Sequence, residues 1–140
     1  MLRQHIDAAK ALAAAHEYID PGDVFDVFRE SGATAVSGNY FVLTVTIRGY
    51  AGERNTAPED VAGDYSVEFK WRVVAVDAGG LVDLVDALRT QFVGQRLEVP
   101  GRACSPFTGD MDDADHDSNT RLFYQDIYFD TVSSRAAATT

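Results

Sequence analysis

The chain has 140 residues, 46% of them hydrophobic, which suits one domain with a substantial core and makes wholesale disorder unexpected. It carries 22 acidic and 12 basic residues, and this formal net charge of -10 disfavours binding to nucleic acid or to an anionic membrane surface. Its one cysteine, Cys104, excludes an internal disulfide, and no segment approaches the roughly 18 apolar residues that a membrane span needs.

The chain is expected to begin with a helix and a short strand. Residues 2–18 are rich in alanine, which has the highest helix propensity. The apolar face of this helix, at steps of three or four residues, consists of Leu2, Ile6, Ala9 and Ala13. The DPG sequence at 20–22 ends the helix, because proline disfavours a helical residue before it. A short strand is then expected at 23–28.

Two long segments predict an antiparallel hairpin. Residues 39–50 alternate strictly, and the apolar face of this strand holds Phe41, Leu43, Val45 and Ile47. Residues 65–76 alternate in the same way, and their apolar face holds Tyr65, Val67, Phe69, Trp71, Val73 and Ala75. The polar loop between them, 51–64, is longer than ordinary hairpin connections of about two to five residues.

The C-terminal half predicts a second helix and two more strands. Residues 79–94 form the helix, with Gly94 as its stop and an apolar stripe of Leu81, Leu84, Val85, Leu88 and Phe92. A strand is expected at 95–100, with Leu97 and Val99 facing inward. The last strand is expected at 121–132, with Phe123, Ile127 and Phe129 on one face and Tyr124 and Tyr128 on the other.

This element order predicts an α+β domain, with one mainly antiparallel sheet and two helices packed on it. The domain spans residues 1–132, and residues 133–140 form a C-terminal tail of small residues. Three apolar stripes must share one core, so five residues are expected to be buried together: Phe69, Trp71, Leu84, Leu88 and Phe129.

The acidic sequence DMDDADHD at 110–117 is interpreted as a solvated loop without a specific metal. A calcium-binding EF-hand loop needs glycine at position 6 and glutamate at position 12. A loop that starts at Asp113 has Ser118 and Tyr124 there, and a loop that starts at Asp110 has Arg121 at position 12. The five acidic residues of the run are Asp110, Asp112, Asp113, Asp115 and Asp117.

No other pattern of metal-binding or catalytic residues is found in the sequence. His116 has no partner histidine at zinc-ligand spacing, and Cys104 has no C-x-x-C companion. His5 and His16 are expected to be surface or interface residues. We therefore predict no cofactor, no metal and no enzymatic activity.

The second face of the sheet carries more apolar residues than a monomer would be expected to expose. They are Val42, Val74, Val76, Tyr124 and Tyr128. One interpretation is that this face packs against a second chain. The other is that the first helix simply covers it.

The segment order resembles that of the tail terminator proteins of long-tailed bacteriophages, the minor tail protein U-like family. The resemblance covers residues 2–132 and follows GDVFDVF, NYFVLTVTIRGY, YSVEFKWRVVAVD, GLVDLVDALRTQFVG and RLFYQDIYFDTV in that order. Family members often have a proline and a tyrosine before the first long strand, whereas Asn39-Tyr40 keeps only the tyrosine. The acidic run is also not typical of the family.

The resemblance implies a ring, usually of six subunits, at the head-proximal end of the tail tube. Such a ring stops tube polymerisation, contacts the major tail tube protein and a head-tail connector or stopper protein, and lets genomic DNA pass without binding it. It implies a virion protein of the tail or neck, assembled in the host cytoplasm. An acidic channel suits DNA passage, because few cations would displace the counterions of phosphate.

The expected contacts with other chains lie in the 51–64 loop and on the last strand. The candidate interface residues are Glu53, Arg54, Glu59, Asp60, Tyr124 and Tyr128. Three alternatives stay open: another neck or tail-tube protein of the same assembly, a small cation-binding domain built on the acidic run with His116, and a protein that mimics DNA by its negative charge.

Overall fold

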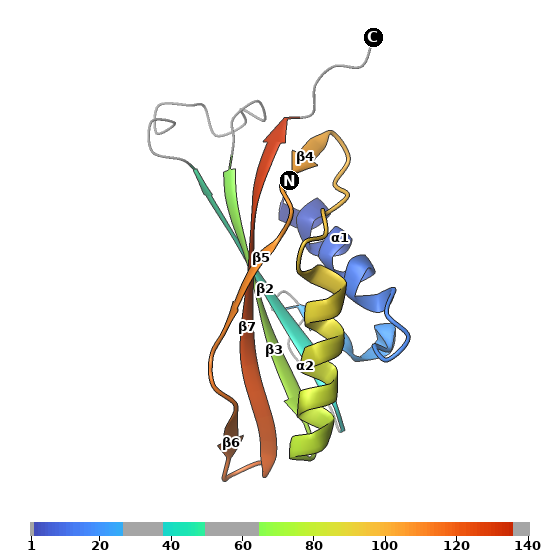
Figure 1. Cartoon of the computed structure of the whole chain (residues 1–140), viewed down its shortest axis with the longest axis vertical. Coiled ribbons are helices and arrows are strands. Elements are labelled where there is room, and N and C mark those ends of the chain that lie inside the picture. The colour runs from blue at the N-terminus through green and yellow to red at the C-terminus, as the bar shows by residue number, and fades with distance from the viewer. Residues whose placement is uncertain (1, 27–37, 50–64, 136–140) are drawn as a thin grey trace.

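In the computed structural model, residues 2–26, 38–49 and 65–135 are described, so the predicted 51–64 loop lies outside the described residues. The order is helix α1 (Leu2–Ala14), a short 3-10 helix η1 (Pro21–Asp23), β1 (Val24–Asp26), β2 (Tyr40–Gly49), β3 (Tyr65–Ala75), α2 (Ala78–Phe92), β4 (Arg102–Cys104), β5 (Thr108–Met111), β6 (Asp115–Asp117) and β7 (Leu122–Arg135). The predicted α+β class is confirmed, with both helices on one side of the sheet (Figure 1).

The described residues form a seven-stranded sheet of the order β1-β2-β3-β7-β4, with β5 and β6 also paired to β7. All pairings are antiparallel except that of β1 with β2, which is parallel. Strand β7 has 14 residues, and β6, β5 and β4 pair with its successive thirds along one edge. The register aligns Leu43 with Trp71 and Trp71 with Ile127, so apolar residues of three strands meet on one face.

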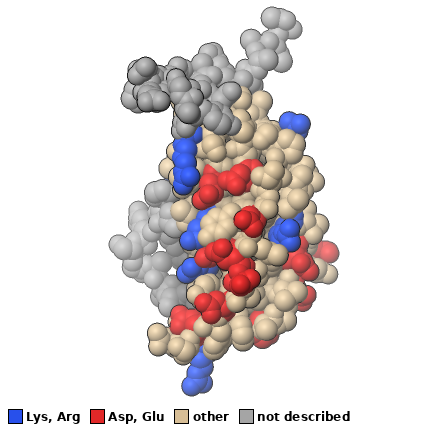
Figure 2. All heavy atoms as spheres, turned by 60° about the vertical axis from the view of Figure 1, so that its left-hand side comes forward, with Lys and Arg blue, Asp and Glu red and all other residues tan. Residues whose placement is uncertain are grey.

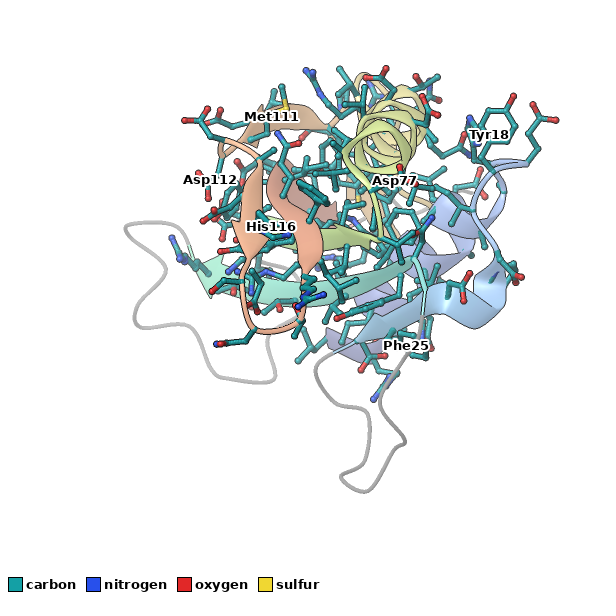
Figure 3. All side chains as sticks on the ribbon, turned by 90° about the horizontal axis from the view of Figure 1, so that it is seen from below. Tyr18, Phe25, Asp77, Met111, Asp112 and His116 are labelled. Carbon is teal, nitrogen blue, oxygen red and sulfur yellow. The ribbon has the colours of Figure 1, made fainter. Side chains whose placement is uncertain are left out.

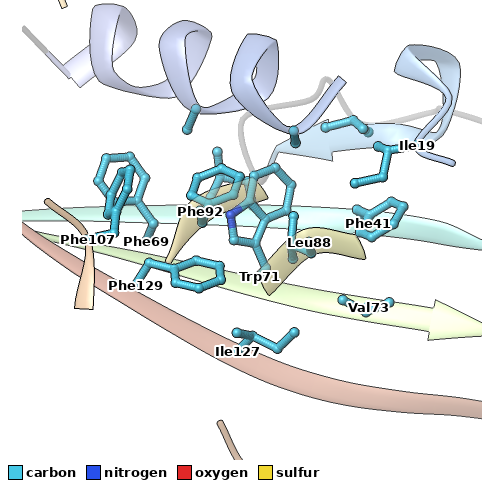
Figure 4. Packing of buried hydrophobic residues seen from close by; sticks show 14 of the residues in the cluster. Ile19, Phe41, Phe69, Trp71, Val73, Leu88, Phe92, Phe107, Ile127 and Phe129 are labelled. Carbon is cyan, nitrogen blue, oxygen red and sulfur yellow. The ribbon is translucent and has the colours of Figure 1, made fainter. Parts of the chain in front are cut away.

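The predicted hairpin is confirmed, and its alternation explains the core. Trp71, Phe69 and Phe129 are fully buried, together with Leu88 from α2 (Figure 4). Leu84 is only partly buried against this cluster, which differs from the prediction. The rings of Phe92 and Phe129 stack with centroids 4.8 Å apart, and this contact fixes the end of α2 on the sheet.

The C-terminal end of each helix has a local cause. Gly94, directly after the C-cap residue of α2, has a φ of 78°, which glycine adopts without strain, so its predicted role as a stop is confirmed. Helix α1 ends at Ala14, four residues before the predicted end. The chain turns there because Ile19 is 2% exposed and packs into the core, and this requires the backbone to leave the helix axis.

Three predictions in the C-terminal half are wrong. Residues 95–100 form no strand, although Leu97 and Val99 are buried as expected. No strand was predicted between residues 100 and 121, but this segment contributes β4, β5 and β6. Strand β7 continues to Arg135, past the predicted end at 132, because β4 pairs with its last three residues.

His5 was predicted to be a surface or interface residue, but it is fully buried within the chain. Its Nε2 lies 3.0 Å from Ser133 Oγ, which is itself fully buried near the end of β7. Arg102 Nε donates to the same oxygen at 3.0 Å. These polar contacts join α1, β4 and β7, and they explain why a histidine is tolerated on the inner face of α1.

Candidate functional site

The face of the sheet turned away from both helices, here called the outer face, is the candidate site. It consists of alternate residues of the three long strands, and the helices pack on the opposite face through Ile6, Ala9 and Leu88. The interpretation that the first helix covers the outer face is therefore wrong. Val74 is 4% exposed on the outer face, whereas Val76, beyond the end of β3, is 52% exposed.

The centre of the outer face is an ion pair between neighbouring strands. Arg72 on β3 stands opposite Asp126 on β7, and its Nε and Nη2 donate to the two carboxylate oxygens at 2.8 and 3.0 Å. This bidentate geometry is the strongest form of the interaction. Because the guanidinium donates to the carboxylate, the pKa of Asp126 is lowered, and that of Arg72 is raised for the same reason.

Two further residues surround this pair. Lys70 Nζ lies 3.8 Å from Asp126 Oδ2, and the Arg72 guanidinium lies 4.6 Å from the centre of the Tyr124 ring. A cation over an aromatic face gains electrostatic attraction and holds the ring in one orientation. These contacts hold a cluster of polar side chains in fixed positions on the face of the sheet that neither helix covers.

The acidic run lies beside this centre and is bound to the two tyrosines of β7. The Tyr128 hydroxyl donates to Asp112 Oδ2 at 2.9 Å, and the Tyr124 hydroxyl donates to Asp115 Oδ2 at 3.1 Å. Each hydrogen bond to a carboxylate raises the pKa of the tyrosine concerned. The predicted opposite-face position of Tyr124 and Tyr128 is confirmed, and they connect the sheet face to the acidic edge.

The acidic run is not a loop throughout, which corrects the prediction, because only residues 112–114 lie outside a strand. Residues 108–111 and 115–117 are strands β5 and β6, and both pair with β7. All four residues of β5 are exposed, so the run has no apolar alternation, and alternation was the signal used to find strands. The long open edge of β7 supplies the backbone partners, and acidic side chains on an edge strand discourage further pairing.

The remaining acidic residues of the run are exposed or half-buried and bond locally. Asp110 Oδ1 accepts from the N–H of Met111 at 2.8 Å, and Asp117 Oδ1 accepts from that of Asn119 at 2.9 Å, which lowers the pKa of Asp117. Asp113 is exposed between β5 and β6. Within residues 2–26, 38–49 and 65–135, no three histidine, cysteine or acidic side chains are grouped so as to hold a metal ion.

Acidic side chains form an irregular band on this side of the molecule, with basic side chains beside and among them (Figure 2). The acidic residues on the outer face and its edge are Glu68, Asp110, Asp112, Asp113, Asp115, Asp117, Asp126 and Asp130. Lys70 and Arg72 neutralise part of this charge at the centre. The chemistry of the surface is that of a negative, hydroxyl-bearing face, suited to repelling phosphate.

Sequence reasoning did not identify the central pair. Arg72 and Asp126 are 54 residues apart, and only the register of β3 with β7 brings them together. The one sequence feature that points to this pair is that both residues lie on the polar faces of predicted strands. The other candidate interface residues, Glu53, Arg54, Glu59 and Asp60, lie outside the described residues.

One solved structure with a similar fold is a chain of the "Virion of native gene transfer agent (GTA) particle". The two chains superpose with a TM-score of 0.64, and 13% of the aligned residues are identical. The match covers 92% of this chain and 96% of the other. No protein-family model matches the chain, and no curated protein matches its sequence. At this identity the likeness establishes a shared fold over nearly the whole of both chains.

No helix in the described part of the chain has both the length and the apolar character to cross a membrane.

Proposed function

We propose that the protein is a structural component of a phage-like virion and that it acts as a tail terminator. In this role several copies, six in the expected arrangement, form a ring at the head-proximal end of the tail tube. The ring ends polymerisation of the tube and joins it to the head connector. The observation that carries the proposal is the shared fold with a virion chain over 92% of this chain and 96% of the other.

The outer face supports this function because it suits contact with other chains or with a channel. No helix of the described residues covers this face, and its bidentate ion pair and ordered tyrosines offer fixed polar groups to a partner. Asp126 is nevertheless 8% exposed and held by Arg72. In the proposed ring, the acidic edge of β5 and β6 borders the channel, where its carboxylates keep passing DNA from binding.

The partners follow from this role. They are further copies of the chain, the major tail tube protein and a head connector or stopper protein. Segment 51–64, with Glu53, Arg54, Glu59 and Asp60, is proposed to contact another chain, and Tyr124 and Tyr128 are proposed to border an interface. The protein would act in the tail or neck of the virion after assembly in the host cytoplasm. No residue is assigned a catalytic role.

The proposal is tested by the native mass of the purified protein. A closed ring, of six copies in the expected form, supports a terminator. A protein that stays monomeric at every concentration, and also when mixed with its tube protein, contradicts the proposal. Negative-stain images of the same sample would show whether the assembly is closed or open-ended.

One specific observation favours a second candidate, a protein that mimics DNA. The acidic residues are not confined to one loop but extend along β5, β6 and the neighbouring positions of β7. Such a spread of carboxylates along a surface can compete with phosphate for a DNA-binding protein. This candidate predicts a monomer or small oligomer that loses its partner when salt is raised.

A further inference from the structure

A groove lies on the side of the molecule that carries the helices, between the turn after α1 and the exposed face of α2. It has a volume of about 610 Å³, and its lining includes Tyr18, Asp83, Leu84, Asp86 and Ala87. Tyr18 is 68% exposed, although the ring of His16 lies against it with centroids 5.3 Å apart. The Tyr18 N–H also donates to His16 Nδ1 at 3.1 Å, so the tyrosine is held beside the groove.

The lining of this groove fits the side chain of an arginine. Asp83 and Asp86 are three residues apart on one helix, so their carboxylates are neighbours. Neither forms an ion pair within 4.0 Å with any described residue. Two carboxylates attract a guanidinium, an aromatic ring offers it a face, and the apolar floor of Leu84 and Ala87 accepts the aliphatic stem.

An arginine that matches this lining is exposed elsewhere on the same chain. Arg121 is exposed in the turn between β6 and β7, which lies at one end of the molecule (Figure 1). Its φ is 61°, in the left-handed region that glycine or asparagine occupies at lower cost. Its side chain forms no ion pair within the parts of the chain that the structure describes. Turn geometry alone therefore does not explain an arginine here, and such outliers are concentrated at functional sites.

The groove and the arginine-bearing strands lie on different sides of the molecule. Seen from below, His116 on β6 and Asp112 between β5 and β6 lie on one side, and Tyr18 lies on the other (Figure 3). A cyclic ring requires this arrangement, because each copy must offer two different surfaces to its two neighbours. Copies that each carry a formal charge of -10 repel one another, so a contact that brings a cation to carboxylates is favoured.

We infer that the α1–α2 groove of one copy receives Arg121 from the β6–β7 turn of the next copy in the ring. The inference rests on the proposed function and deepens it by naming the two surfaces that meet. The guanidinium lies between Asp83 and Asp86 and against the ring of Tyr18. When this contact repeats around the ring, the groove and the β6–β7 turn of every copy are both buried in interfaces.

Charge exchange in the full-length protein tests the contact. The first variant carries Arg121→Glu, the second carries Asp83→Arg with Asp86→Arg, and the third combines all three changes. Native mass is measured over a range of protein concentrations. Each of the first two variants is expected to need about tenfold or more protein for half-assembly, because like charges then meet. The combined variant is expected to recover most of the assembly.

Two matched variants separate assembly from folding. Arg121→Gly suits the positive φ, so it should keep or raise the melting temperature while assembly falls. Arg96→Glu makes the same charge change at another exposed arginine, which follows α2 and is not part of the outer face, and should assemble as the unchanged protein does. Thermal melting of every variant shows whether the fold is retained.

The outcomes are distinct. If the unchanged protein forms a ring and the first two variants and Arg121→Gly assemble equally well, the inference is overturned and the proposed function stands. If those variants fail to assemble and the combination does not recover, the residues do not face each other and the inference is again overturned. If the unchanged protein forms no ring, the proposed function itself fails.

Discussion

Arg72 and Asp126 stand opposite each other in the register of β3 and β7, joined by hydrogen bonds of 2.8 and 3.0 Å. The Asp126 side chain is 11% exposed, whereas the Arg72 side chain is 47% exposed. The pair therefore fixes the relation between two central strands while the guanidinium stays open to a partner. This combination of order and access suits the outer face to the contact with other chains that we propose.

Replacing Asp126 by asparagine is expected to lower the free energy of unfolding by about 1–2 kcal/mol at pH 7, because a charge-assisted hydrogen bond is lost. The pKa of Asp126 is lowered in the folded protein, so its contribution is complete above the unfolded value of about 3.9. It disappears as pH falls through the folded value. Denaturant unfolding of both proteins between about pH 7 and pH 2 should show converging stabilities. Parallel curves would contradict this account.

Leu88→Ala tests the packing of α2 on the sheet. Leu88 is fully buried in the cluster with Trp71 and Phe129, so the change should cost about 2–5 kcal/mol in the free energy of unfolding. Val82→Ala is the matched control, because Val82 lies on the same helix and is 58% exposed. Its cost should stay within about 0.5 kcal/mol. Equal costs at the two positions would contradict the assigned face of α2.

Replacing the five aspartates of the acidic run by asparagine should leave the fold intact. Asparagine oxygens can still accept the hydrogen bonds from Tyr124 and Tyr128, and the backbone pairing of β5 and β6 with β7 is unchanged. Thermal melting of the unchanged protein should respond alike to calcium and magnesium. If calcium but not magnesium raised the melting temperature, and the variant lost this effect, the acidic run would be a calcium site after all.

The same variant addresses the role of the negative charge. In particles assembled with it, DNA delivery should fall while assembly stays normal, because the channel is then less repulsive to phosphate. Normal delivery from normally assembled particles would indicate that the acidic edge serves another purpose.

Strands with one buried and one exposed face can be predicted from the sequence, whereas a strand without buried residues cannot. Strands β2 and β3 alternate between core and outer face, so their period of two is visible. Strand β5 is exposed at every position, so only the long edge of β7 determines its structure. The Arg72–Asp126 pair and the parallel pairing of β1 with β2 depend on the register of distant segments, which no local pattern encodes.

Residues 51–64 are predicted to contact another chain. Deleting about eight of them should spare the fold, because β2 and β3 pair over Tyr40–Gly49 and Tyr65–Ala75 without them. The deletion should reduce assembly, measured by native mass and by the yield of complete particles. Particles of full length and normal infectivity would show that the segment is only a spacer.

Tail length in particles made without this protein tests the central claim most directly. A tail terminator caps the growing tube, so its loss should give tubes of variable, excessive length without heads, as seen by electron microscopy. Supplying the purified protein during assembly should restore a uniform length and joining to heads. Tubes of normal, uniform length joined to heads in the absence of the protein would contradict the account.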